Sequence, residues 1–255
     1  AWSCTAIGTL LDDALLRTQG AELLSELLPT DVPAGDSLEL LNGWGGVVAA
    51  ALAVAAAADH TGLQRKASSL AMGYCDQLRR QLDDNSDRRV TTRSGLAHGS
   101  TGVTVALGAC VLHPGDPGAG DLLHRLLRAE DDRPPTSNAS WCWGQAGYLL
   151  ARHQPWVDST HRDPSVLDAA ATATAATPAL AHLCCGAAGQ VEALLATPGH
   201  RHAAEHLGAG LASGGRLRYE QGTEAWSPTL FRGAAGVGLT LLRLAGHRLP
   251  SPTTT

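Results

Sequence analysis

The sequence predicts an all-α fold built from a repeated pair of helices. Alanine and leucine dominate its apolar residues, whereas the aromatic residues that favour strands make up only 4% of the 255 residues. A Gly-x-x-Gly motif followed by an apolar run occurs five times. The first glycines of successive motifs lie 56, 45, 42 and 47 residues apart. This period suits one helical hairpin per repeat, in which each hairpin buries its apolar face on its neighbours.

Each motif is predicted to begin a short apolar helix of the kind that suits an inner layer. Glycine is poorly tolerated inside helices, so glycines that recur at one position of a repeat are expected at helix ends. The five motifs are Gly43–Gly46, Gly99–Gly102, Gly144–Gly147, Gly186–Gly189 and Gly233–Gly236.

Between the motifs, the sequence predicts more polar helices that suit an outer layer. Asp163 is expected to cap one of them, with Pro164 at its first position. The outer helices are expected at Leu63–Leu82, Asp121–Glu130, Pro164–Ala175 and His200–Ala212. Stretches rich in Gly, Pro, Asp and Ser separate the pairs, at residues 83–94, 113–120, 131–140 and 214–227.

Alternating inner and outer helices describe either an open solenoid or a closed α/α toroid. The toroid is favoured, because small residues at every inner N-terminus allow the helix starts to crowd around one end of a barrel. A helical repeat in which the glycine motif is purely structural is the alternative that the pattern leaves open.

Charge and composition exclude several classes of protein. The chain has 19 basic and 24 acidic residues and a formal charge of −5, whereas nucleic-acid binders usually present a basic face. No apolar run is long enough to span a membrane, and no secretory signal pattern is visible. Six cysteines are too few for a disulfide scaffold. We therefore expect a cytoplasmic protein in a reducing compartment.

Reactive residues accompany three of the motifs. His98, Cys142 and Cys185 each lie within two residues of a first glycine, so equivalent repeats would bring them together. Cys184 adds a third thiol, and three protein ligands with an open fourth position are typical of catalytic zinc. Two alternatives are small buried cysteines and a strained disulfide between Cys184 and Cys185. Buried filling is expected for the cysteines outside the motifs, which are Cys4, Cys75 and Cys110.

At these motifs the sequence resembles the LanC-like lanthionine cyclases, and most of all the C-terminal cyclase domain of class II lanthipeptide synthetases. The match runs in order from about Leu38 to Pro250. The residues that carry it are Gly95-Leu96-Ala97-His98-Gly99, Ser140-Trp141-Cys142-Trp143-Gly144, Leu183-Cys184-Cys185-Gly186 with Ala187-Ala188-Gly189, and Leu230-Phe231-Arg232-Gly233-Ala234-Ala235-Gly236.

The resemblance implies an α/α toroid that binds one Zn²⁺ through Cys142, Cys184 and Cys185. It implies a carbon–sulfur bond-forming lyase of lanthipeptide biosynthesis, whose partner is a dehydrated precursor peptide. A peptide cysteine adds to dehydroalanine or dehydrobutyrine and closes a thioether ring. His98 matches the family's acid/base histidine. Glu39 stands where the family usually has Asp, and its carboxylate would orient His98 or balance its charge.

Four features depart from the family pattern. The family commonly has Cys-His-Gly where this chain has Cys184-Cys185-Gly186, and three cysteines resemble a class II subgroup noted for broad substrate range. Glu39 replaces Asp, and Trp143 replaces a polar residue. The family's toroid also has more hairpins than the five motifs found here.

The domain organisation expected from this resemblance is one LanC-like domain over residues 1–255. Residues 1–37 would supply a partial first hairpin of a toroid truncated at its N-terminus, and residues 38–250 would hold the five repeats. An upstream dehydratase domain is a further expected partner, and we expect a monomer that neither spans a membrane nor binds nucleic acid.

Three competing functions are open. His202-Ala203-Ala204-Glu205-His206 matches the H-x-x-E-H pattern of some zinc proteases, although the further ligand would have to be Glu220 or Glu224. A non-catalytic module that binds thiols or peptides is the stronger alternative.

A toroid glycosidase needs two opposed carboxylates, for which Glu39 and Glu192 are the candidates. It leaves the cysteines unexplained. His182, close to Cys185, is a possible substitute zinc ligand but is expected to pack or to face solvent.

Overall fold

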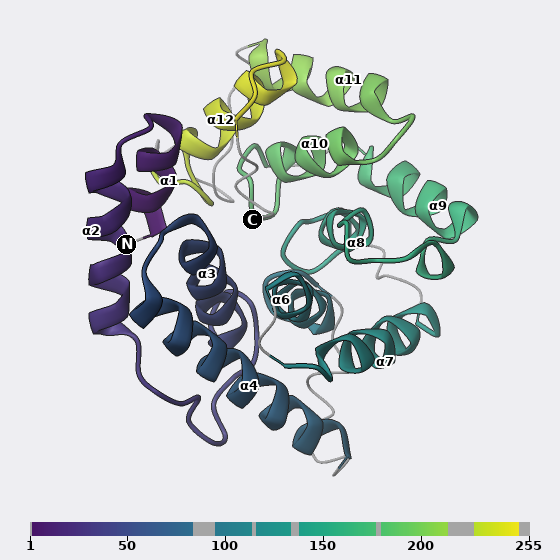
Figure 1. The fold of residues 1–255 in the computed structure, drawn as a ribbon. Coiled ribbons are helices and arrows are strands. Elements are labelled where there is room, and N and C mark those ends of the chain that lie inside the picture. Colours follow the sequence, from purple (N-terminus) through teal and green to yellow (C-terminus); the bar gives the residue numbers. More distant parts are fainter. Residues whose placement is uncertain are drawn as a thin grey trace. The chain divides into compact units, whose positions relative to one another are not determined.

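The computed structural model describes residues 2–83, 95–113, 116–133, 138–176, 180–213 and 227–249. Within these ranges every regular element is a helix, which confirms the all-α class (Figure 1). The chain divides into two compact units, and each is described by itself. The first is Ala1–Thr92 with Gly102–Ala129, and the second is Arg93–Thr101 with Glu130–Thr255.

The first unit begins with two helices that pack against each other, α1 (Trp2–Leu10) and α2 (Ala14–Leu27). The carboxylate of Asp13 caps α2 by accepting a hydrogen bond from the Leu16 N–H at 3.0 Å. The apolar motif helix α3 (Trp44–Ala57) then packs against the longer α4 (Thr61–Asp83). Most of α6 (Ser100–Leu112) and α7 (Ala119–Asp131) also belongs to this unit.

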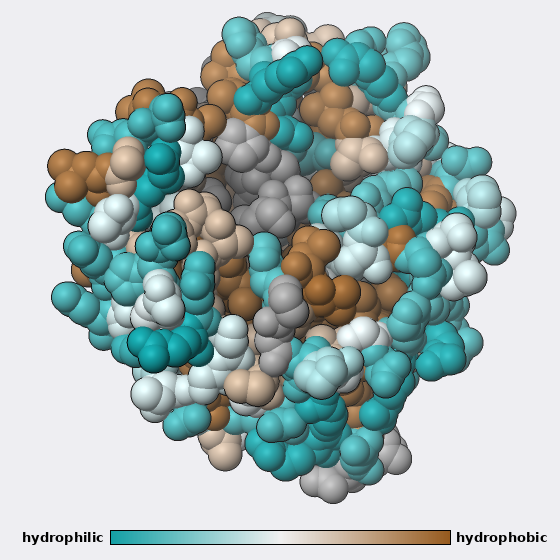
Figure 2. Space-filling view, viewed as in Figure 1, coloured by the Kyte–Doolittle hydropathy of each residue, from teal (hydrophilic) through white to brown (hydrophobic). Residues whose placement is uncertain are grey.

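The α1–α2 hairpin leaves much of its apolar surface exposed. Figure 2 shows part of this surface as a small hydrophobic group at the upper left of the view. Its large exposed side chains are Ile7, Leu10, Leu11, Leu15, Leu23 and Leu27. In contrast, a regular set of side chains on α4 is buried, including Leu63, Leu70 and Tyr74.

The second unit repeats one arrangement of inner and outer helices. The motif helices α8 (Gln145–Arg152), α10 (Ala187–Ala196) and α12 (Ala234–Leu244) pack in that order, with α10 in contact with the other two. Every residue of α8 is buried. The outer helices α9 (Pro164–Thr174) and α11 (Arg201–Ala212) cover α8 and α10, and each buries residues on one side only.

The outer helices confirm the sequence prediction within two residues at each end. They are α4, α7, α9 and α11, and Asp163 caps α9 at its Pro164 start as expected. The predicted polar connections at 83–94 and 214–227 lie almost wholly outside the described residues. No helix in the described ranges combines the length and the apolar character that a membrane span requires.

The first glycine of each motif is the residue at which a loop turns into a helix. The N–H after it donates to the carbonyl six residues before it, at 2.8–2.9 Å in the four motifs at Gly43, Gly144, Gly186 and Gly233. In each of these motifs, a Cβ on that glycine would collide with the same carbonyl oxygen. The motif is therefore required by a close backbone approach within the repeat.

The second glycine of the motif provides contact between repeats. A Cβ on Gly147 would overlap the Trp141 carbonyl oxygen and would lie 2.8 Å from the Leu96 Cβ of the preceding repeat. Likewise, a Cβ on Gly189 would lie 3.1 Å from the Trp141 Cβ. The sequence-based idea that small residues let helix starts crowd together is thus confirmed for these neighbours. In addition, the first glycine of each of these motifs lets the loop before the helix approach closely, a role that the sequence did not predict.

We expect Gly147→Ala to destabilise the protein by about 1–3 kcal/mol, because the new Cβ has backbone on one side and Leu96 on the other. Gly210→Ala is the matched control, since Gly210 lies in α11 with nothing within 4 Å of its would-be Cβ. That substitution should stabilise α11 by about 0.5–1 kcal/mol. Thermal unfolding followed by circular dichroism measures both changes. Equal melting temperatures for the two variants would contradict this account of the motif.

Candidate metal centre

Backbone hydrogen bonds join the same position of four successive repeats. This position lies two residues before the first glycine and is occupied by Ala97, Cys142, Cys184 and Phe231. The Ala97 N–H donates to the Cys142 carbonyl at 3.2 Å, and the Cys142 N–H donates to the Cys184 carbonyl at 3.2 Å. The Cys184 N–H then donates to the Phe231 carbonyl at 3.0 Å. We call these four residues the repeat ladder, because it fixes the register between neighbouring loops of the second unit.

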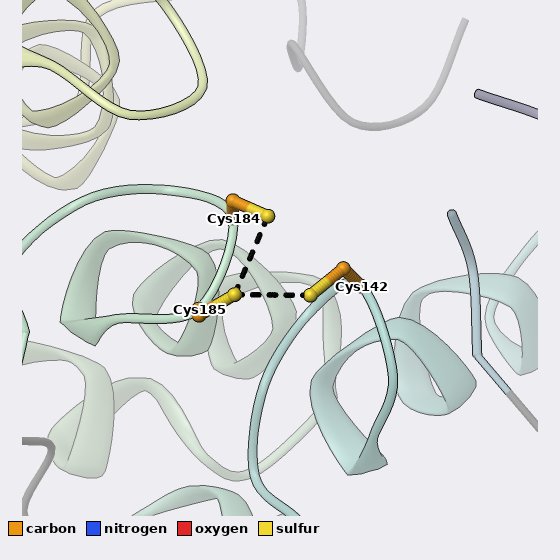
Figure 3. A group of neighbouring side chains, drawn as sticks. All are labelled: Cys142, Cys184 and Cys185. Carbon is orange, nitrogen blue, oxygen red and sulfur yellow. Dashed lines mark hydrogen bonds between the residues drawn. The ribbon is translucent and has the colours of Figure 1, made fainter. Parts of the chain in front are cut away.

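The repeat ladder brings three cysteine sulfurs together (Figure 3). Cys142 comes from the loop before α8, and Cys184 and Cys185 come from the loop before α10. The Sγ atoms of Cys142 and Cys185 are 3.1 Å apart, and those of Cys185 and Cys184 are 3.4 Å apart. All three lie within 4.8 Å of one another. All six cysteines are free, so the predicted alternative of a Cys184–Cys185 disulfide does not occur in the structure.

The donor set fits a thiophilic divalent ion. Zinc bound tetrahedrally at about 2.3 Å from each sulfur would separate the sulfurs by about 3.8 Å, so small shifts of the three side chains would suffice. Exposure increases across the cluster, since Cys142 is buried, Cys184 is half-buried and Cys185 is exposed. The exposed side would leave a fourth ligand position open to a thiol from outside, as in catalytic zinc sites.

The three thiols strongly affect one another's ionisation. Hydrogen bonds from Cys184 and then Cys185 lower the pKa of Cys142 to about 3. Interaction with Cys142 in turn raises the pKa of Cys184, and it raises the pKa of Cys185 to about 11. These interactions therefore favour a thiolate at Cys142 and protonated thiols at Cys184 and Cys185. An ion that binds all three sulfurs must displace those protons.

Three further residues affect the cluster in ways that the sequence did not predict. The Ser140 hydroxyl accepts a 3.7 Å hydrogen bond from the Cys142 thiol and a 3.3 Å bond from the Trp143 N–H. The positive charge of Arg232, an exposed residue, lowers the pKa of Cys185 against the stronger opposing effect of Cys142. Arg232 could have been found from the repeat, because it precedes its first glycine as Cys185 does.

His182 is the third of these neighbours, and sequence reasoning considered it only as a substitute ligand. It is buried, and its Nδ1 accepts a 3.2 Å hydrogen bond from the Cys185 N–H. The expectation that His182 packs is thus confirmed. The His182 ring thus holds the backbone of Cys185 in place. In this way it helps to orient the Cys185 thiol towards the other two cysteines.

His98 lies against the loop that carries Cys142. Its imidazole stacks on the Trp143 indole, with ring centroids 4.9 Å apart and an interplanar angle of 29°. The Ala97–Cys142 bond of the repeat ladder holds the two loops in register. In the sequence analysis, Trp143 was interpreted as the loss of a polar residue that the family has at this position. In the structure it provides a flat surface that orients the histidine.

Glu39 belongs to the first unit, whereas His98 and the three cysteines belong to the second. It lies four residues before Gly43 in the loop that leads to α3. Its N–H donates to the Ser37 hydroxyl at 3.3 Å, and its carbonyl accepts a 3.2 Å bond from the Gly45 N–H. The helper role of Glu39 therefore stays a prediction.

The residues considered for a protease or a glycosidase are either exposed or hydrogen-bonded to other residues. His202, Glu205 and His206 are exposed on α11, and the Glu205 carboxylate accepts a 2.9 Å bond from Arg201. Glu220 and Glu224, the further ligands considered for a protease, lie outside the described residues.

The glycosidase candidate Glu192 is buried, and it accepts a 3.0 Å bond from the Arg243 guanidinium. Among the cysteines outside the motifs, Cys75 and Cys110 are buried as expected, whereas Cys4 is only half-buried.

We expect the three-sulfur cluster to bind Co²⁺ and to produce a sulfur-to-cobalt charge-transfer band in the near ultraviolet. Cys142→Ala should abolish this band or greatly weaken it, because the two remaining sulfurs bind the ion less well than three. Cys4→Ala is the control, since it removes a thiol from α1 in the other unit. Titration of reduced protein with Co²⁺ measures the effect, and an unchanged band in Cys142→Ala would rule out this metal centre.

A known protein family matches nearly the whole chain. Residues 2–251 match the family described as lanthionine synthetase C-like protein. No individual curated protein matches the chain. The all-helical architecture of the described residues is consistent with the α/α toroid of that family. Because the match extends over nearly the whole sequence, the chain belongs to the lanthionine synthetase C-like family.

Proposed function

We propose that this protein is a zinc-dependent lanthionine cyclase. The observation that carries the proposal is the meeting of Cys142, Cys184 and Cys185 in a chain of the lanthionine synthetase C-like family. Three thiolates with an exposed fourth side suit a site that receives another thiol. The substrate would be a precursor peptide that contains cysteine together with dehydroalanine or dehydrobutyrine.

Within the family, we assign the chain to the cyclase domain of class II synthetases, in the subgroup with three cysteine ligands. Cys185 at the position of the family's histidine supports this assignment. We propose further that the protein acts as a monomer in the cytoplasm, and that a dehydratase domain supplies its substrate. The free state of all six cysteines fits a reducing compartment.

The three cysteines would hold the metal, with Cys142 as the buried ligand and Cys185 nearest to solvent. When bound, zinc supplies the positive charge that lowers the pKa of an incoming thiol into the neutral range. The His182 ring fixes the backbone of Cys185 through the 3.2 Å hydrogen bond to its N–H. The Ser140 hydroxyl lies 3.7 Å from the Cys142 sulfur and could donate a hydrogen bond to the thiolate.

Ring closure would form a bond between the peptide sulfur and the β-carbon of the dehydro residue, while the carbon–carbon π bond breaks. The α-carbon then needs one proton, and the thiol has released one, so the reaction is balanced without a further reagent. We assign the transfer of this proton to His98, because an imidazole ring can both take up and release a proton. Glu39 remains our candidate for orienting His98 by its carboxylate.

Two variants separate metal binding from proton transfer. Cys142→Ala should lose both zinc and cyclisation, whereas His98→Asn should keep about one zinc per chain and lose most of its cyclisation rate. Zinc is measured by elemental analysis. Cyclisation is measured with a synthetic peptide that has one cysteine and one dehydroalanine. Because ring closure leaves the mass unchanged, loss of reaction with N-ethylmaleimide reports it.

Cys4→Ala is again the control and should keep both properties. Metal-replete and fully active Cys142→Ala protein would overturn the site. Thiol binding by the wild type without ring closure would instead favour the non-catalytic binding module over the cyclase.

A further inference from the structure

A buried carboxylate lies directly behind the loop that carries His98. Glu130, near the end of α7, is only 7% exposed. Its Oε1 accepts hydrogen bonds from the Ser100 hydroxyl at 2.6 Å and from the Thr101 hydroxyl at 2.9 Å. These two residues begin α6, and they follow His98 and its motif glycine in the sequence. All of them belong to the second unit.

The Thr101 hydroxyl also closes the loop on its other side. Its oxygen accepts a 3.4 Å hydrogen bond from the Gly95 N–H. Gly95 has a φ of 137°, a conformation that favours glycine, and a Cβ there would lie 2.5 Å from the Cys142 carbonyl oxygen. The loop from Gly95 to Thr101 is thus tied at both ends through one hydroxyl group, with His98 between them.

The Glu130 carboxylate also forms an ion pair with a fully buried cation. The Arg152 side chain is 0% exposed, and its Nη2 lies 3.3 Å from Glu130 Oε2. Its Nη1 contacts Asp131 Oδ1 at 2.9 Å and donates to the His161 carbonyl at 3.2 Å. The guanidinium also stands 4.8 Å from the centre of the Tyr148 ring. Glu130 therefore has one oxygen fixed by Arg152 and the other available to the α6 hydroxyls.

We propose that Thr101 and Glu130 are positioning residues that hold His98 against Trp143 beside the metal centre. This inference rests on the proposed role of His98 in proton transfer. A buried ion pair is weak support for stability, because the cost of desolvating both charges offsets their attraction. Its directional hydrogen bonds, however, fix geometry, and here the geometry that they fix is that of the His98 loop.

A second buried pair in the same unit shows the difference. Glu192 accepts a 3.0 Å bond from Arg243 and joins α10 to α12. Glu130 instead accepts its two described bonds from Ser100 and Thr101. Burial and pairing are thus common to both carboxylates, and the bonds of Glu130 connect it to the loop that carries the proposed acid/base.

The test is Thr101→Val, which removes the bridging hydroxyl but leaves the Glu130–Arg152 pair intact. Thr240→Val is the matched control, because Thr240 is also fully buried in this unit and its hydroxyl has no hydrogen-bond partner among the described residues. Thr101→Ser restores the hydroxyl and should restore function. We expect Thr101→Val to keep its zinc and its KM for the dehydroalanine peptide while kcat falls about tenfold or more.

The imidazole signals of zinc-loaded, histidine-labelled protein in NMR give a readout that a purely structural role would not change. The His98 signal is assigned by its absence in His98→Asn. Thr101→Val should shift or broaden it, whereas Thr240→Val should not. A folded Thr101→Val protein with an unchanged His98 signal overturns the inference, whatever its kcat. If the wild type proves unable to cyclise the peptide, the proposed function fails, and the His98 signal still decides whether Thr101 positions the histidine.

Discussion

The close backbone approach that glycine allows at the motifs is the constraint on which the rest of the structure depends. The loops before α3, α8, α10 and α12 fold back so that a carbonyl six residues before the first glycine receives the first N–H after it. This geometry leaves no room for a Cβ at Gly144 or Gly186, nor at the second glycines Gly147 and Gly189. Because the loop is tied to its own helix, neighbouring loops meet in a reproducible way, and the Ala97–Cys142–Cys184–Phe231 ladder follows.

That regularity explains how a site can be made from residues far apart in the sequence. Cys142 and Cys185 are 43 residues apart, yet their sulfurs lie 3.1 Å from each other because each occupies a corresponding loop of its repeat. The position next to the first glycine holds His98, Trp143, Cys185 and Arg232 in successive motifs. This one position of the repeat thereby provides an imidazole, a stacking surface, a thiol and a positive charge. The scaffold is repetitive, and the chemistry resides in the residues that differ between repeats.

Sequence reasoning could predict what depends on the repeat and could not predict what depends on packing between different elements. The bounds of α4 and α11 follow from apolar periodicity, and the meeting of the three cysteines follows from their equivalent positions. The stacking of His98 on Trp143 has no signal of this kind, because it depends on the orientation of two rings. The bond between Glu130 and Thr101 was not predicted either. Glu130 lies 29 residues from Thr101 on an outer helix, and carboxylates on such helices usually face solvent.

In the proposed cyclase, three thiolates hold zinc and leave its fourth position open to a peptide thiol. Zinc-edge X-ray absorption on the loaded protein measures the ligand set directly. We expect three sulfurs at about 2.3 Å and one lighter atom around the zinc of the protein without peptide. Addition of a peptide that contains cysteine and dehydroalanine should bring in a fourth sulfur. Fewer than three sulfurs, or four sulfurs before any peptide is added, would contradict the proposed ligand set.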